Sequence, residues 1–170
     1  LMPGVRDLDF PGASVLLRDT EKDLAIFREE NVPLFTRIQT LAQEYSALSG
    51  AMSIEWEGAE LPLPRASVKL QSTDRPLRQQ VYETIQSRRF QDSARLQALY
   101  SELIALRHQV ALNAGFVGFR DYMFVSMGRF DYTPADCFAF HEAVEKAVVP
   151  LVRRQVIRRK QNLRVDPLRP

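Results

Sequence analysis

The strongest constraint on the fold is a stripe of apolar side chains between residues 92 and 114. Its members recur at intervals of three and four residues, which places them on one face of an α-helix. They are Leu96, Leu99, Leu103, Leu106 and Val110. Gly115 comes directly after the stripe, and glycine often ends a helix because it adopts a left-handed backbone conformation at little cost. The pattern predicts a long helix from about Asp92 to Ala114.

Two further helices are predicted before residue 51. Residues 1–18 contain two prolines and two glycines without a clear apolar period, so we interpret them as an irregular lead-in. Residues 19–31 have a helical character, and Asn31 with Pro33 marks a restart, because proline is tolerated best in the first turn of a helix. The second helix is expected to end at Gly50. Its apolar stripe comprises Leu34, Ile38, Leu41, Tyr45 and Leu48.

A small β-hairpin is predicted between residues 52 and 63. Apolar Met52, Ile54 and Trp56 alternate with polar residues, and Gly58 supplies a turn before the alternation resumes. Such alternation is the period of a half-buried strand. Because an isolated hairpin is only marginally stable in water, we expect its apolar face to pack against helices.

The next helix is predicted from its start signal. Thr73 or Asp74 can accept hydrogen bonds from free backbone amides, and Pro76 suits the first turn that follows. We expect this helix to turn near Phe90 and to pack antiparallel against the helix of residues 92–114. Its apolar stripe is Leu77, Val81 and Ile85.

The last third of the chain carries a second clear start signal. Thr133 can cap a helix, Pro134 occupies its first position, and Asp136 lies near the positive end of the helix dipole. The helix is expected to reach about Asn162, with a kink at Pro150. A short aromatic helix from about Gly118 should precede it and pack in the core. The predicted fold is mainly α: antiparallel helical hairpins with one small β-hairpin.

Composition narrows the possible classes of protein. The chain has 170 residues, 45% of them hydrophobic, which is enough to bury a core. A single cysteine excludes an internal disulfide and a cysteine zinc cluster. No apolar run approaches the about 20 residues that span a bilayer, and the N-terminus lacks the layout of a secretory signal. We therefore expect a soluble, cytoplasmic protein without a membrane partner.

Positive charge is concentrated in residues 141–170, which hold eight basic and three acidic side chains. The basic residues around Arg153 and Arg158 interleave with apolar residues at helical spacing. This is typical of an amphipathic helix with a solvated basic face. No nucleic-acid-binding module is recognisable, so nucleic acid is not an expected partner.

The sequence offers few residues for catalysis. Its histidines are His108 and His141, and the stretch from His141 to Glu145 resembles the zinc motif HExxH except that a glutamate stands at the second ligand position. A zinc site needs at least one more ligand, so no metal site is assigned. Cys137 has no neighbouring histidine to act as its base, and we interpret it as a packed residue.

Five residues are kept as candidate site residues, with a structural role as the alternative for each. Arg120 with Asp121, and Arg129 with Asp131, could bind a peptide carboxylate or form ion pairs, and ion pairing is the favoured interpretation. The five are Arg120, Tyr122, Arg129, Tyr132 and His141.

Several segments resemble the oligoendopeptidase F branch of the thimet oligopeptidase family of zinc metallopeptidases, from about Glu30 to Pro170. Four of them are ENVPLF from Glu30, SIEWEG from Ser53, TDRPLRQQVY from Thr73 and ALRHQVALNAGFVGFRDYMF from Ala105. The most specific is GRFDYTPADCFAFHEAVEKAVVPL from Gly128. Their ordered succession makes coincidence improbable.

The resemblance implies a helical enzyme with two lobes and a deep channel that admits short unstructured peptides. In that family, HExxH and a later glutamate hold zinc, which polarises the peptide carbonyl, while the motif glutamate activates water. None of these residues has a counterpart here. The resemblance therefore implies the N-terminal lobe, a channel wall, and makes the five candidate site residues possible substrate-channel residues. It also implies that the zinc ligands lie outside this chain and that the chain alone has no activity.

We expect residues 19–170 to form this helical lobe and to need a downstream catalytic domain for completion. The chain opens with Leu1 and stops at Pro170, which we interpret as the limits of a fragment of a hydrolase. Helix stripes meant for the other lobe would then be exposed and favour self-association. The alternative is a non-catalytic helical module that binds a peptide or a partner helix. A third possibility is a parent chain that has lost its zinc ligands.

Overall fold

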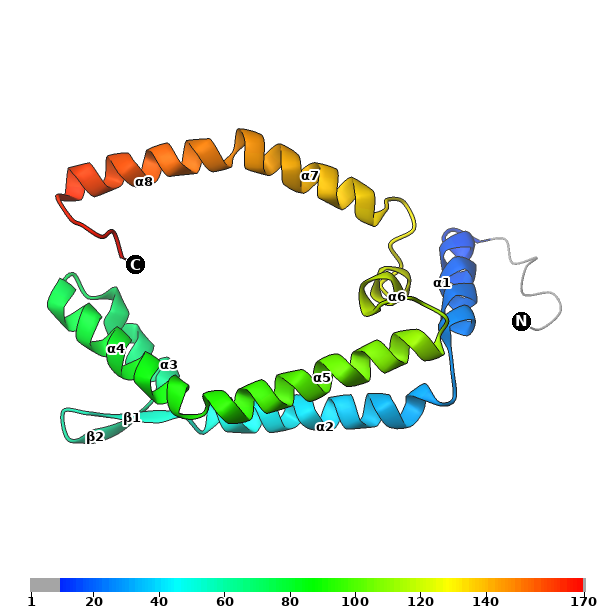
Figure 1. Ribbon diagram of the computed structural model, residues 1–170, viewed down its shortest axis with the longest axis horizontal. Coiled ribbons are helices and arrows are strands. Elements are labelled where there is room, and N and C mark those ends of the chain that lie inside the picture. The colour runs from blue at the N-terminus through cyan, green and yellow to red at the C-terminus, as the bar shows by residue number, and fades with distance from the viewer. Residues whose placement is uncertain (1–9, 170) are drawn as a thin grey trace. The chain divides into compact units, whose positions relative to one another are not determined.

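The computed structural model describes residues 10–169, and helices dominate it (Figure 1). The chain divides into two compact units. The central unit comprises residues 26–119, and the terminal unit comprises the described residues up to 25 together with those from 120 onward. The sequence predicted the helices but gave no sign of a boundary at these two positions.

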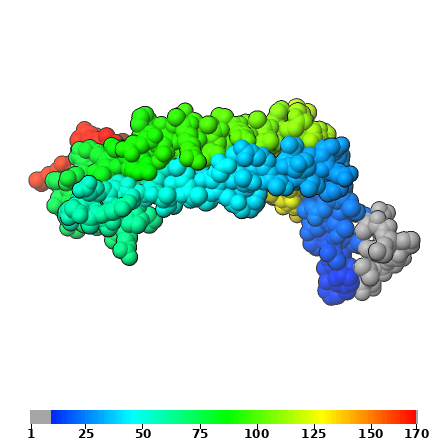
Figure 2. All heavy atoms as spheres, turned by 90° about the horizontal axis from the view of Figure 1, so that it is seen from below, coloured from blue at the N-terminus to red at the C-terminus, as the bar shows by residue number. Residues whose placement is uncertain are grey.

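Two long helices form the body of the central unit. Helix α2 (Asn31–Gly50) and helix α5 (Ser93–Asn113) run antiparallel and lie side by side along their lengths (Figures 1 and 2). Leu41 of α2 is completely buried between Leu99 and Leu103 of α5. Partly buried side chains extend this contact; they are Ile38, Leu48 and Leu106. The predicted stripe of α5 is confirmed as its packed face, and that of α2 is confirmed except at Tyr45, which is 54% exposed.

The end of α5 follows the predicted glycine signal. Gly115 has a φ of 85°, in the left-handed region. The backbone N–H of Phe116 donates to the Ala111 carbonyl oxygen at 2.9 Å, and the N–H of Gly115 donates to the Leu112 carbonyl oxygen at 2.9 Å. These two bonds satisfy carbonyl groups that the helix itself leaves without partners.

The predicted β-hairpin is present. Strand β1 (Ser53–Trp56) pairs antiparallel with β2 (Ala59–Pro62), with Trp56 opposite Ala59. The turn residues Glu57 and Gly58 both have positive φ, 54° and 78°, as tight two-residue hairpin turns require. The hairpin's buried side chains join the second core cluster of the central unit.

That second core lies between the hairpin and the three helices that follow it in the sequence. They are α3 (Leu63–Val68), the 3₁₀ helix η2 (Lys69–Gln71) and α4 (Arg75–Gln91). Its buried members are Met52, Ile54, Trp56, Leu63, Ala66, Val81 and Ile85. Asp74 caps α4, because its carboxylate accepts a hydrogen bond from the Leu77 backbone N–H. The predicted start of α4 is confirmed, whereas α3 and η2 were not predicted.

The prediction that α4 and α5 bury their apolar stripes against each other is wrong. Val81 and Ile85 of α4 face the hairpin and α3, and α5 buries its own stripe against α2. Leu96 is the side chain of α5 that packs against the second core. Phe90, at the junction between the two helices, is largely exposed. Each helix had a suitable apolar face, but the hairpin and α3 already cover that of α4.

Helix α1 (Ala13–Ile26) begins earlier than predicted. Residues 13–18 were assigned to an irregular lead-in, yet they are helical. Gly12 has a φ of 90°, and its carbonyl oxygen accepts hydrogen bonds from the backbone N–H groups of Val15 and Leu16 at 3.1 Å each. Proline and glycine at positions 11 and 12 thus precede a helix instead of excluding one. The lead-in prediction for residues 1–9 lies outside the described residues.

The terminal unit also contains α6 (Phe119–Ser126), α7 (Pro134–Ala147) and α8 (Val149–Leu163). Thr133 and Asp136 form the expected capping box at the start of α7. Val148 separates α7 from α8, and Pro150 occupies the first turn of α8. The predicted kink is therefore present, as a break between two helices.

Helices α7 and α8 contain no buried residue. Large apolar side chains of α7 and α8 are exposed; they are Phe138, Phe140, Leu151, Val152, Val156, Ile157 and Leu163. Within residues 10–169, each helix is too short or too polar to cross a membrane.

Candidate functional site

The five residues singled out in the sequence all lie in the terminal unit, on three consecutive segments. Arg120 and Tyr122 belong to α6, Arg129 and Tyr132 to the loop between α6 and α7, and His141 to α7. The structure places four of them, all except Tyr122, beside one of two aromatic rings, Phe124 and Phe138.

The first centre, which we call the Phe124 cluster, consists of Phe124, Arg129 and Tyr132. The Arg129 guanidinium lies over the Phe124 ring, 5.0 Å from its centroid. Tyr132 meets the same ring edge-on, with centroids 5.5 Å apart and an interplanar angle of 77°. A cation over an aromatic face and an edge-on ring pair are both favourable electrostatic arrangements. The cluster therefore fixes a positive charge beside a phenol group.

The second centre, the Phe138 cluster, lies at the start of α7. The Arg120 guanidinium is 5.8 Å from the Phe138 centroid, and its Nε lies 2.8 Å from an Asp121 carboxylate oxygen. The hydrogen bond that Arg120 donates to the Asp121 carboxylate raises the pKa of Arg120. The centroid of the His141 ring lies 6.4 Å from that of Phe138 and 6.3 Å from that of Phe140. The predicted Arg120–Asp121 ion pair is confirmed.

Tyr122 differs from the other four because it is buried. Desolvation by burial raises the pKa of its phenol, and a hydrogen bond with the Ser126 side chain opposes part of that rise. A buried phenol within one turn of its partner fits packing inside the unit better than contact with a ligand.

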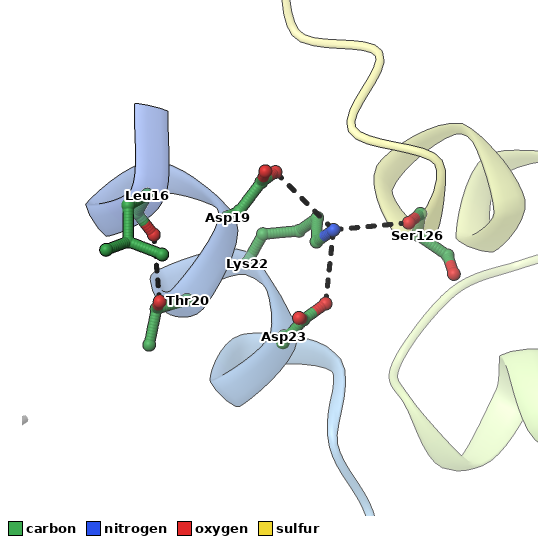
Figure 3. A network of polar contacts seen from close by, with 6 residues as sticks. All are labelled: Leu16, Asp19, Thr20, Lys22, Asp23 and Ser126. Atoms are coloured by element: carbon green, nitrogen blue, oxygen red, sulfur yellow. Dashed lines mark hydrogen bonds and ion pairs between the residues drawn. The ribbon is translucent and has the colours of Figure 1, made fainter. Parts of the chain in front are cut away.

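The sequence did not identify two cations of α1, Lys22, which contacts the end of α6, and Arg18, which contacts the loop between α6 and α7. Lys22 is only 12% exposed, and its Nζ lies 3.1 Å from Asp23, 3.6 Å from Asp19 and 3.3 Å from the Ser126 carbonyl oxygen (Figure 3). The hydrogen bond with Asp23 is the main cause of the raised pKa of Lys22. Since Ser126 is the last residue of α6, the cation satisfies a carbonyl at the negative end of a helix dipole.

Arg18 is the second of these cations. Its guanidinium lies 4.3 Å from the centroid of the Phe130 ring, and its Nη1 lies 3.5 Å from Asp131 Oδ1. The predicted pairing of Arg129 with Asp131 is therefore wrong, because Asp131 pairs with Arg18. No sequence signal links Arg18 or Lys22 to a loop more than 100 residues away, so only the structure identifies them.

The donor set does not fit zinc. Glu142, next to His141, forms an ion pair with Lys146 at 3.3 Å, and the ring of His141 is flanked by two phenylalanines. His108 belongs to the central unit. Among residues 10–169, no group of three or more histidine, cysteine, aspartate or glutamate side chains could hold a metal ion.

Three solved structures resemble the chain over most of its length. The first, a 3.1 Å X-ray structure of a candidate oligoendopeptidase F, has a TM-score of 0.89 and 27% sequence identity. The second, a candidate oligoendopeptidase F from Bacillus anthracis strain Ames, has a TM-score of 0.92 and 23% identity. The third, PZ peptidase A with an inhibitor, has a TM-score of 0.84 and 24% identity. The last two establish a shared fold.

The matches cover this chain far more completely than they cover its relatives. They include 96%, 98% and 89% of this chain, but 29%, 31% and 27% of the three proteins in the same order. The chain thus spans about a third or less of their length. No curated protein sequence matched the chain. Residues 68–170, more than half of the chain, match the model of peptidase family M3, and the chain therefore belongs to this family.

Proposed function

We propose that this chain is the N-terminal, substrate-channel-forming part of a zinc-dependent oligoendopeptidase that hydrolyses short peptides. Membership of peptidase family M3 supports a peptidase, and the resemblance over 96% of the chain to a candidate oligoendopeptidase F supports the subclass. The observation that carries the proposal is the asymmetry of that match. The match includes 96% of this chain but only 29% of the candidate oligoendopeptidase F.

In this proposal the zinc site belongs to another part of a longer polypeptide. The zinc motif HExxH requires two histidines four residues apart, and the chain has only His108 and His141. A channel wall has no need of them, because it encloses the peptide while other residues act on the scissile bond. We therefore propose that the 170 residues alone bind no zinc and hydrolyse no peptide.

The proposed partners follow from the same division of labour. Residues 19–170 form a lobe that contacts the catalytic domain of the same polypeptide and short unstructured peptides. The exposed apolar residues of α7 and α8 are the proposed contact with that domain, and the proposed location is the cytoplasm.

Two assays test the proposal. The purified chain is incubated with short fluorescence-quenched peptides, with and without added zinc, and its metal content is measured. We expect neither hydrolysis nor bound zinc, and chelator-sensitive cleavage by the chain would contradict the assignment of the active site elsewhere.

In the second test, the coding sequence is read beyond Pro170, and the polypeptide that it encodes is expressed and assayed. We expect an HExxH motif followed by a ligand glutamate, and peptide hydrolysis that a chelator abolishes. A stop codon directly after Pro170 would contradict the proposal and favour a helical binding module.

A further inference from the structure

Arg129 is a cation without a carboxylate partner in the described part of the chain. Its side chain is partly buried, and its guanidinium contacts the Phe124 ring. Arg18 and Arg120 differ, because Arg18 pairs with Asp131 and Arg120 pairs with Asp121. A guanidinium keeps its charge at all physiological pH values, so Arg129 presents a fixed positive charge that no anion of residues 10–169 neutralises.

The contact between Arg129 and Phe124 is made through the face of the aromatic ring, so it does not by itself occupy the N–H donors of the guanidinium. Arginine carries five such donors in one plane. Two of these donors match the two oxygens of a carboxylate. The aromatic contact also restricts the side chain, which lowers the entropy lost when a ligand binds.

Tyr132 supplies a second polar group on the same aromatic ring. Its side chain is 45% exposed, and its ring packs edge-on against Phe124. The phenol can donate and accept hydrogen bonds, so the Phe124 cluster offers an anion-binding cation and a neutral hydrogen-bonding group together.

We propose that Arg129, held on Phe124 beside Tyr132, is a binding site for the carboxylate of a short peptide. The carboxylate is the C-terminal group or an acidic side chain, which share the same chemistry. This inference rests on the proposed function for its ligand class, a peptide. The evidence for the site itself is that Arg129 lies over the Phe124 ring and forms no ion pair with a carboxylate of residues 10–169.

Arg18 is a positioning residue for this site. Asp131 lies two residues from Arg129 and is the nearest carboxylate along the chain. The Arg18 Nη1 lies 3.5 Å from Asp131 Oδ1. The Arg18 guanidinium also lies over the ring of Phe130, the residue between Arg129 and Asp131 in the sequence. Loss of Arg18 would release Asp131 to compete with the peptide for Arg129.

The test follows the Arg129 Nε–H signal of the 170-residue chain by NMR during titration with trialanine. We expect a saturable shift with the free C-terminal carboxylate and none with the C-terminal amide. An amidated peptide that contains one glutamate separates the two carboxylate sources, because its binding would assign the site to acidic side chains. Equal shifts with trialanine and its amide would overturn the proposal.

Variants sharpen the test. Because the Arg129 variants lack the Arg129 Nε–H signal, the binding of trialanine by all variants is measured by titration calorimetry. Arg129→Ala should weaken binding about tenfold or more, the size expected for a lost charged hydrogen bond. Arg129→Lys should recover only part of the lost affinity because it lacks the planar donors. Tyr132→Phe should have a smaller effect. The control is Arg153→Ala, since Arg153 is an exposed arginine on α8. An equal loss in this control would mean non-specific attraction and would overturn the site.

The positioning role has its own readout. Arg18→Ala should weaken trialanine binding, and Arg18→Ala combined with Asp131→Asn should restore it, which a purely structural role for Arg18 would not do. Binding is measured without hydrolysis, so its failure leaves the proposed peptidase role intact. Conversely, chelator-sensitive hydrolysis by the chain would contradict the proposed function and leave the carboxylate site standing.

Discussion

The central and terminal units both contain helices with apolar faces, but they differ in what the apolar side chains contact. In the central unit, Leu41, Val81 and Val110 are completely removed from solvent. In the terminal unit, Phe140 of α7 remains 66% exposed, and α7 and α8 bury no residue at all. The same amphipathic pattern thus yields a dry core in one unit and an uncovered face in the other. A helical pattern specifies a face without supplying its partner.

Different interactions stabilise the interior of each unit. Burial of apolar area stabilises the central unit, at about 25 cal/mol for each Å² removed from water. In the terminal unit, α1 is joined to the end of α6 by the hydrogen bond from Lys22 to the Ser126 carbonyl oxygen. It is joined to the following loop by the ion pair and the cation–aromatic contact of Arg18. Exposed ion pairs contribute little because water and salt screen them. We therefore expect the terminal unit to open more easily.

The largest contrast is expected from matched leucine substitutions. Leu41→Ala should lower the free energy of unfolding by about 2–5 kcal/mol, because it leaves a cavity between α2 and α5. Leu151→Ala in α8 should change it by no more than about 0.5 kcal/mol, because that side chain is 50% exposed. Urea denaturation followed by circular dichroism measures both. Equal losses would show that the face of α8 is covered in solution.

A second contrast concerns asparagine. Asn31 is 1% exposed; its Nδ2 donates to the Val110 carbonyl oxygen at 3.0 Å, and its Oδ1 accepts from Asn113 at 2.8 Å. Asn31→Ala should lower the free energy of unfolding by about 1–3 kcal/mol, since it leaves buried polar groups unsatisfied. The exposed Asn162 of α8 provides the control, and Asn162→Ala should be nearly neutral in the same urea assay.

The exposed faces of α7 and α8 predict concentration-dependent self-association. Contiguous exposed apolar surface favours contact between copies. Light scattering should show a rising mean mass with concentration, and Val152→Lys with Val156→Lys should reduce the rise. A monomer at high concentration in the unsubstituted chain would contradict this prediction.

The smallest effect is expected at the start of α7. Hydrogen bonds from the Thr133 hydroxyl and backbone N–H lower the pKa of Asp136. The folded-state pKa is below the unfolded one, so the cap stabilises α7 fully above the unfolded pKa and is lost as pH falls through the folded pKa. Chemical shifts of residues 134–137 should report loss of helix in acid. Asp136→Asn should remove this pH dependence, and an unchanged acid transition in that variant would refute the assignment to Asp136.

Local signals in the sequence predicted much of the fold. The stripe of α5 and its glycine terminator, the hairpin and the capping box at Thr133 each depend on residues close in sequence. Which helix covers a stripe depends on competition between distant segments. For that reason α5 was paired with α4 in prediction, whereas it packs on α2. The start of α1 was missed because the Pro11–Gly12 pair was interpreted as a sign of irregular chain.

The candidate site was predictable in its residues but not in its connections. Arg129 and Tyr132 stand in the most specific motif of the sequence. Their shared contact with Phe124 depends on the path of the loop after α6. The assignment of Asp131 to Arg18 depends on the packing of α1, a segment that local patterns do not connect to α7. Polar contacts of this kind have no period that a sequence can display.

Hydrogen exchange of backbone amides in the 170-residue chain tests the contrast between the units most directly. Amides in the buried helices α2, α4 and α5 should exchange slowest, near the rate set by global unfolding, and those of α7 and α8 should exchange much faster. At low protein concentration, where self-association is suppressed, this ranking should persist. Equal protection of α7, α8 and α5 under those conditions would contradict the account.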